Sequence, residues 1–196
     1  GEICPVFAGI QQTGAAVPLM VDTLLKILPS AADAVCRFEG GEEKAFDENG
    51  ENALFVFKTI ADPFVGKLSY FRVLSGKIKN DSRLINNRTG AEERLSKIMW
   101  LKGGKQEDAG EIIAGDIGSV SKLGNVLTGD TLSASGKLAA AAVEFPAPTI
   151  SVAVYPKAKG DEEKITQAFS RLCEEDPTIK VYTDNETHEQ ILSALG

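Results

Sequence analysis

The chain has 196 residues, of which 43% are apolar and 25% charged, and its formal net charge at pH 7 is −7. This length allows one sizeable hydrophobic core or two small ones. The longest apolar runs fall far short of the roughly 20 residues needed to cross a bilayer, and the first residues lack a signal-peptide pattern. The negative charge repels phosphate, so a nucleic-acid partner must bind at a local basic patch. We expect neither a membrane nor DNA as partner.

Signatures of catalysis and metal binding are missing from the sequence. Cys4, Cys36 and Cys173 are an odd, scattered set without a C-x-x-C spacing, which is typical of reduced thiols in the cytoplasm. His188 is the only histidine, so no metal site or catalytic triad is predicted. Each Gly-Lys pair is followed by Leu, Ile or Gln, so the phosphate-binding pattern G-x-x-x-x-G-K-[ST] is not formed. We expect a cytoplasmic chain that is not itself an enzyme and holds no cofactor or metal.

The first region, residues 1–47, contains one predicted amphipathic helix. Apolar residues between Val17 and Leu28 recur at helical spacing, and Pro29-Ser30 stops the helix. Residues 40–50, GGEEKAFDENG, are acidic and flanked by glycine, which predicts a linker or an exposed loop. A domain boundary is therefore expected near residue 48.

The second region, residues 48–146, alternates short apolar runs with Gly, Asn and Asp, as strands and turns do. Many short strands at near-regular spacing predict a closed barrel or a sandwich. Pro63 cannot donate a ladder hydrogen bond, so Asp62 to Val65 is predicted to be the irregular, exposed end of a hairpin. The expected strands are residues 54–60, 67–74, 83–86, 93–101, 112–113 and 118–123.

The third region, residues 147–196, changes period. Residues 150–154 alternate as in a strand, and apolar residues from Ile165 to Cys173 share one helical face. Residues 178–182 and 189–193 are expected to be two further strands. The resulting β-α-β-β order is an incomplete ferredoxin-like unit, so we expect the chain to be a fragment of a longer protein.

Five blocks of this sequence resemble elongation factor G, in the order and spacing of that family. They cover its second domain and the first part of its third, and the N-terminal helix ending in ILPS resembles the last helix of its GTPase domain. The resemblance implies a fold that is mainly β with α+β, in which one GTPase-domain helix precedes a translation-factor β-barrel and an incomplete ferredoxin-like unit. The blocks are FKTIADPFVGKLSYFRVLSG (57–76), AGDIGSVSKL (114–123), TGDTL (128–132), EFPAPTISVAVYPKAKGDEEKI (144–165) and RLCEEDPTIKV (171–181).

The resemblance implies that the parent protein is a translational GTPase, with GTP and Mg²⁺ as cofactors, that promotes translocation of transfer RNA and messenger RNA. This fragment would supply ribosome docking and force transmission, with small-subunit ribosomal RNA, ribosomal proteins and the other domains of the parent as partners. Lys and Arg contact phosphates without reading base sequence. The docking candidates are Lys67, Arg72, Arg94, Lys97, Lys102, Lys105, Lys157, Lys159 and Arg171.

One segment departs from the family pattern. Where the family has Ser-Ala before the loop that closes over the guanine base, this chain has AGIQQTG, in which Gly9, Ile10 and Gln11 are a degenerate remnant of that loop. Related ribosomal-protection and release-factor GTPases share the domain order and are alternatives for the parent. A free-standing, non-catalytic adaptor that binds the ribosome or a protein is another alternative.

Overall fold

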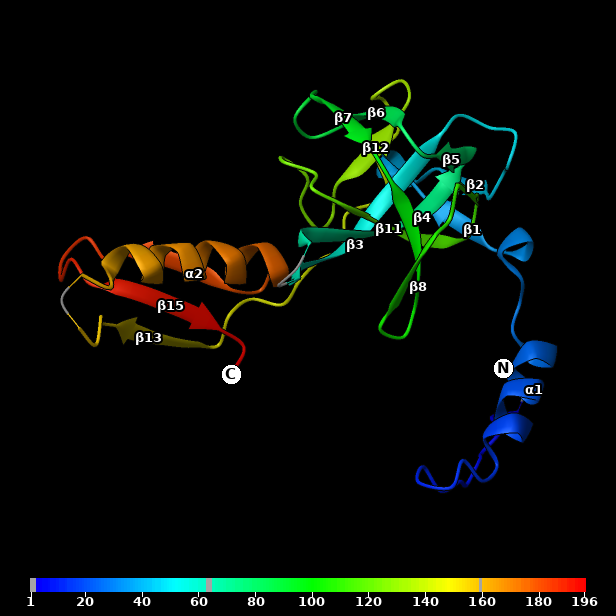
Figure 1. Cartoon of the computed structure of the whole chain (residues 1–196), viewed down its shortest axis with the longest axis horizontal. Helices are drawn as coiled ribbons and strands as arrows, with labels where there is room; N and C mark the ends of the chain where they lie inside the picture. Colours follow the sequence, from blue (N-terminus) through cyan, green and yellow to red (C-terminus); the bar gives the residue numbers. More distant parts are fainter. Residues whose placement is uncertain (1–2, 63–64, 159) are drawn as a thin grey trace.

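The computed structural model describes residues 3–62, 65–158 and 160–196. The architecture is mostly β and has three parts in chain order: an N-terminal segment with one helix, a curled sheet, and a small three-stranded unit with a second helix (Figure 1). This confirms the fold class predicted from the sequence. Within the described residues, no helix is long and apolar enough to span a membrane.

The N-terminal segment begins with α1, Val17–Ile27, where the apolar spacing predicts it. Pro18 occupies the first turn of this helix, where a missing backbone donor costs little. The apolar face of α1 is exposed, with Leu25 at 77% and Val21 at 43%. The elements that follow are η1 at Ala31–Asp33, β1 at Val35–Arg37, η2 at Glu39–Gly41 and β2 at Glu43–Ala45.

The acidic segment predicted to be a linker or open loop, residues 40–50, instead contains a strand. β2 pairs antiparallel with β1. Cys36 of β1 and Phe38, just after β1, are buried with Ala53 and Leu74 of the sheet in one hydrophobic cluster. β2 reads Glu-Lys-Ala with all three side chains exposed, so it has no apolar alternation that could reveal it. The chain from β1 onward therefore packs on the sheet.

Eight strands of the described chain form one antiparallel sheet, in the order β7-β6-β12-β3-β4-β11-β8-β9. Its longest strands, β3 and β4, form the predicted hairpin, and a register shift between Val56 and Lys58 marks a bulge in it. β5, Lys77–Lys79, and β10, Glu111–Ile113, pair separately. The strands of the large sheet are β3 Ala53–Asp62, β4 Gly66–Ser75, β6 Ser82–Asn86, β7 Glu92–Leu95, β8 Ile98–Lys102, β9 Lys105–Asp108, β11 Ile117–Ser121 and β12 Thr131–Ser133.

The large sheet curls because the chain joins its two ends. β7 is first and β8 seventh in the sheet order, yet only Ser96 and Lys97 separate them in the sequence. The amide of Ile98 also donates to the side-chain oxygen of Asn80 at 2.8 Å, which fastens the start of β8 beside the turn before β6. This connection draws the two sides of the sheet toward each other, and the sheet is curled into a half-barrel (Figure 1).

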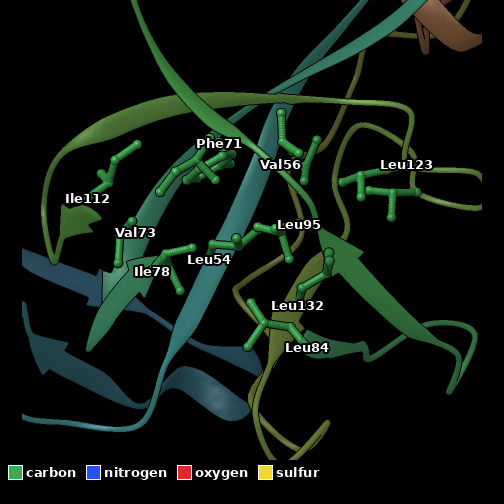
Figure 2. Close-up of a cluster of buried hydrophobic side chains, with 13 residues drawn as sticks. Leu54, Val56, Phe71, Val73, Ile78, Leu84, Leu95, Ile112, Leu123 and Leu132 are labelled. Atoms are coloured by element: carbon green, nitrogen blue, oxygen red, sulfur yellow. The ribbon is translucent and has the colours of Figure 1, made fainter. Parts of the chain in front are cut away.

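One hydrophobic core fills the half-barrel (Figure 2). Leu54 and Val56 of β3 and Phe71 and Val73 of β4 are fully buried. Burying one such side chain contributes about 1.5–3 kcal/mol relative to leaving it exposed. The other members of this core are Ile78, Leu84, Leu95, Ile98, Ile112, Val120, Leu123, Val126 and Leu132. This core fixes the strands whose outer faces carry the basic residues.

The predicted strand at residues 93–101 is two strands in the structure. β7 ends at Leu95 and β8 begins at Ile98, because the chain crosses from one end of the sheet to the other between them. β9 and β12 were not predicted. β9 reads Lys-Gln-Glu-Asp with every side chain exposed, and β12 has only three residues.

The third unit has the predicted β-α-β-β order. It consists of β13 Ile150–Val154, α2 Glu162–Glu175, β14 Lys180–Thr183 and β15 Gln190–Ala194. The sheet order is β13-β15-β14, with both outer strands antiparallel to β15. β13 and β14 therefore run parallel, α2 connects them, and β15 lies between them. This is the split β-α-β arrangement of a ferredoxin-like unit.

Candidate nucleic-acid interface

The predicted basic residues differ in exposure. Lys67 and Arg72 of β4 are half-buried. Six of the others are exposed: Arg94, Lys97, Lys102, Lys105, Lys157 and Arg171. Lys159 lies outside the described residues. The structure thus separates side chains that hold the chain together from side chains that are open to a partner.

Lys67 reaches the helix of the third unit. Its Nζ lies 3.2 Å from Oε2 of Glu174, and its side chain is 17% exposed. On the other strand of the hairpin, the amide of Ala61 donates to Oε1 of Glu175. The two strands of the β3–β4 hairpin, next to its predicted irregular end, therefore lie against α2, as Figure 1 shows. The tip at residues 63–64 lies outside the described part of the chain.

Arg72 fastens the N-terminal segment to the sheet. Its Nε donates to the carbonyl of Gly115 at 3.1 Å, and its guanidinium lies 4.4 Å from the ring centroid of Phe46. A cation over an aromatic face is attracted by the ring quadrupole. Burial raises the pKa of the nearby Cys36 thiol, and the charge of Arg72 opposes that rise. The positive charge of Arg72 is thus engaged within the chain.

The β8–β9 hairpin carries exposed positive charge at one edge of the sheet. Lys102 and Lys105 are the last pair of its ladder, and Gly103-Gly104 connects them. Like charges on opposed strands repel, and Glu107 neutralises one of them, with its Oε2 2.6 Å from Nζ of Lys102. Lys105 forms no ion pair with any residue that the structure describes. Lys105 is the first residue of β9, next to the turn of the β8–β9 hairpin, and β8 extends from the sheet in Figure 1.

Arg94 and Lys97 form exposed ion pairs. Nη2 of Arg94 lies 2.7 Å from Oδ1 of Asp81, and Nζ of Lys97 lies 3.3 Å from Oδ2 of Asp108. Hydrogen bonds from the Asn80 side chain, the Gly110 amide and Lys97 lower the pKa of Asp108. All four side chains of these pairs are more than half exposed. Pairs of this kind are weak, so their cations can exchange a carboxylate for a phosphate.

Two of the predicted docking cations, Lys157 and Arg171, belong to the third unit and not to the β8–β9 hairpin. Lys157 is in the exposed loop between β13 and α2. Arg171, on α2, lines a cavity of about 350 Å³ together with Lys67 and Glu174. Arg171 therefore lies beside the joint between α2 and the β3–β4 hairpin.

Gly9, Ile10 and Gln11 lie in an exposed stretch before α1. The amide of Ile10 donates to the carbonyl of Ala15 at 3.3 Å. A Cβ at Gly9 would lie 2.8 Å from that same oxygen, so the turn needs glycine there. Among the described residues, no group of three or more His, Cys, Asp or Glu is placed to hold a metal ion.

A groove that the sequence did not predict lies between β4, β8 and β11. Its volume is about 610 Å³, and Tyr70, Trp100 and Ile117 give it apolar walls beside Lys102 and Asp116. The indole nitrogen of Trp100 is buried and has no hydrogen-bond partner among the described residues. The groove can accept an apolar or aromatic group. Trp100, within IMWLK, is the residue that could have indicated a binding groove, but the sequence alone does not place Tyr70 and Ile117 beside it.

Two family models match the chain. The model of elongation factor G domain 2 matches residues 51–135, and the model of elongation factor G, domain III matches residues 145–196. Together they match more than half of the chain. The half-barrel and the split β-α-β unit thus define a translation elongation factor.

Individual relatives agree with these models. Elongation factor G of Fervidobacterium nodosum is 38% identical over 198 residues, which cover 98% of this chain and 29% of the relative. A crystal structure of a protein from Thermus thermophilus matches with a TM-score of 0.73 and 27% identity, over 92% of this chain and 26% of that one. The chain belongs to the elongation factor G family and contains regions that match its domains II and III. It spans less than a third of the length of the F. nodosum relative.

Proposed function

We propose that this chain is the ribosome-docking and force-transmitting part of a translational GTPase that moves transfer RNA and messenger RNA during protein synthesis. The observation that carries the proposal is the match to two consecutive elongation factor G domains, at residues 51–135 and 145–196. Its partners are then small-subunit ribosomal RNA, ribosomal proteins and the other domains of the parent. The cytoplasm is the compartment in which these partners meet.

We propose domain boundaries at residues 47/48 and 146/147. Residues 1–47 then belong to the end of the GTPase domain and its linker, 48–146 form domain II, and 147–196 form part of domain III. The first matched range falls within the proposed domain II, and the second begins two residues before the proposed domain III, which supports these limits. The exposed apolar face of α1, with Leu25 at 77% and Leu28 at 61%, supports a packing partner in the rest of the parent.

In this proposal GTP and Mg²⁺ are held by another part of the parent. The residues present do not fit them, because the sequence lacks G-x-x-x-x-G-K-[ST] and the described residues lack a cluster of metal-binding side chains. Gly9, Ile10 and Gln11 would add no more than backbone contacts to a guanine base. Nucleotide hydrolysis is therefore not assigned to any residue of this chain.

The β8–β9 hairpin is the proposed docking surface of the barrel. Residues 48–146 contain 13 Lys and Arg against 12 Asp and Glu, whereas the rest of the chain has 8 against 16. The barrel is thus the part of the chain that phosphate can approach. Lys105 binds phosphate directly, because it has no ion pair among the described residues. Lys102, Lys97 and Arg94 can also bind phosphate once they release their exposed carboxylate partners. Lys157 is the matching candidate in the third unit.

Sedimentation with small ribosomal subunits tests the proposal. We expect the chain to bind weakly and less at higher salt, because each phosphate contact releases counterions. Lys105→Glu should weaken binding and reduce the slope of log affinity against log salt concentration by about one, the value for one lost phosphate contact. The matched control is Lys137→Glu, at an exposed cation of the barrel outside this hairpin. Equal binding of the two variants at every salt concentration would exclude Lys105 as a docking residue.

A further inference from the structure

Two polar contacts between described residues join the β3–β4 hairpin to α2. Lys67 pairs with Glu174 at 3.2 Å, and the amide of Ala61 donates to the carboxylate of Glu175. The two glutamates are consecutive residues at the C-terminal end of α2. One end of the half-barrel is thus attached to one end of the helix, as seen where α2 reaches β3 in Figure 1.

The hairpin supplies the charge that this end of the helix lacks. The C-terminus of a helix carries a partial negative charge, which favours cations and disfavours carboxylates. α2 ends in Leu-Cys-Glu-Glu, so two carboxylates add to the unfavourable charge. The ammonium of Lys67 lies beside them at a side-chain exposure of 17%. Docking therefore relieves an electrostatic conflict at the end of α2.

The contact is small and incompletely packed. A cavity of about 350 Å³ lies between the two elements, and Lys67, Arg171, Glu174 and Glu175 are among the residues that line it. The side chain of Glu174 is still 45% exposed. An ion pair this exposed is weak and is screened by salt. The joint can therefore open without disturbing the core of either unit.

A short tether keeps the joint closed despite its weak contacts. Before the third unit, the amide of Ala141 donates a hydrogen bond to the carbonyl of Arg37. The third unit begins where the amide of Thr149 donates to the carbonyl of Ala194. Between them the chain includes Pro146 and Pro148, which favour an extended backbone. A tether of this length holds the partners at high effective concentration.

We infer that Lys67 and Ala61 with Glu174 and Glu175 form a salt-sensitive latch between the half-barrel and the third unit. When the latch is closed, the two units tumble as one body. When it opens, the third unit turns about the proline-containing tether while both units stay folded. The latch goes beyond ribosome docking because it is a property of the isolated chain.

Hydrogen exchange at the Ala61 amide tests one half of the latch. This amide donates to a residue of the other unit, so its protection reports docking. Glu175→Ala should speed its exchange by roughly fivefold, as expected for the loss of one hydrogen bond, and leave the core amide of Phe71 unchanged. An Ala61 amide that exchanges equally fast in both proteins would overturn the inference.

A charge swap tests the other half. In nitrogen-15 relaxation measurements, Lys67→Glu and Glu174→Lys should each let the third unit tumble faster than the barrel, and the double variant should restore common tumbling. Added salt should act on the native chain as the single variants do. The matched control exchanges Arg83 and Glu92, an exposed ion pair within the barrel, and should change nothing. If the single variants tumble like the native chain, or if the double variant fails to restore common tumbling, the inference that Lys67 and Glu174 hold the two units together is wrong.

Discussion

Arg88 and Asp130 join two turns of the half-barrel that are far apart in the sequence. Nε and Nη2 of Arg88 donate to the two carboxylate oxygens of Asp130 at 2.7 and 2.8 Å. The same carboxylate accepts from the Asn86 side chain at 2.7 Å and from the Leu127 amide at 2.9 Å. The side chain of Asp130 is 5% exposed, so four donors satisfy a carboxylate that is nearly removed from water.

Asp130→Ala should destabilise the chain strongly. The substitution leaves the buried amide of Asn86 and the guanidinium of Arg88 without their acceptor. Removing one partner from such a network costs roughly 2–4 kcal/mol. Urea unfolding measures the loss. Glu92→Ala, which breaks an exposed pair with Arg83, is the control and should cost less than about 1 kcal/mol. Equal losses would show that the network contributes no more than a surface pair.

The contribution of Asp130 should disappear in acid. Burial raises the pKa of Asp130, but hydrogen bonds from Arg88, Leu127 and Asn86 outweigh it, so the pKa of the folded state is lowered. The folded chain then binds this proton less readily than the unfolded chain, whose aspartate pKa is about 3.9. The stabilisation is complete above that value and is lost as the pH falls through the folded-state pKa.

Unfolding free energies of the native chain and of Asp130→Asn, measured from about pH 6 to about pH 3, check this sign. We expect the difference between the two proteins to shrink as the pH falls. A difference that is constant or grows in acid would contradict the assigned direction of the pKa shift.

Core and helix leucines should differ sharply in their effect on stability. Leu54 is fully buried, and Leu54→Ala should cost about 2–5 kcal/mol through lost burial and a cavity. Leu25 on α1 is 77% exposed, and Leu25→Ala should change the unfolding free energy by less than about 0.5 kcal/mol. Thermal unfolding of both variants makes the comparison. A large loss at Leu25 would mean that α1 packs within this chain.

Gly76 should tolerate no side chain. Its φ is +74°, and a Cβ there would lie 2.2 Å from Oδ1 and 2.8 Å from Cα of Asn52. That oxygen accepts from the amide of Lys77 at 3.0 Å, so it cannot move freely. Gly76→Ala should cost more than about 1 kcal/mol in urea unfolding. Gly104→Ala meets nothing within 4 Å and should be nearly neutral.

The sequence predicted the parts of the fold in which apolar residues recur regularly. α1, the β3–β4 hairpin and the β-α-β-β unit lie within a few residues of their expected positions. β2 and β9 could not be found in this way, because they are short and every side chain on them is exposed. Their strand structure depends on pairing with a neighbour, which is not encoded in their own hydrophobic pattern.

The candidate interface was predictable in composition but not in arrangement. The sequence alone does not distinguish Lys67 from Lys105. In the structure, Lys67 pairs with Glu174, which is 107 positions later in the chain, whereas Lys105 has no ion-pair partner in the described residues. Which cation is neutralised depends on how the two units meet. The contact between the hairpin and α2 has no local signal, because each side chain in it is ordinary for its own element.

Cross-linking from position 105 tests most directly whether the barrel docks on the ribosome through the β8–β9 hairpin. A photo-activated group is attached to Lys105→Cys in a chain whose exposed Cys4 is replaced by serine, and small ribosomal subunits are added. The same group at Lys137→Cys, and the chain with neither substitution, provide the controls. We expect cross-links to small-subunit RNA from position 105 well above both controls, and fewer at high salt. Cross-linking from position 105 at no more than the level of position 137 would contradict docking through this hairpin.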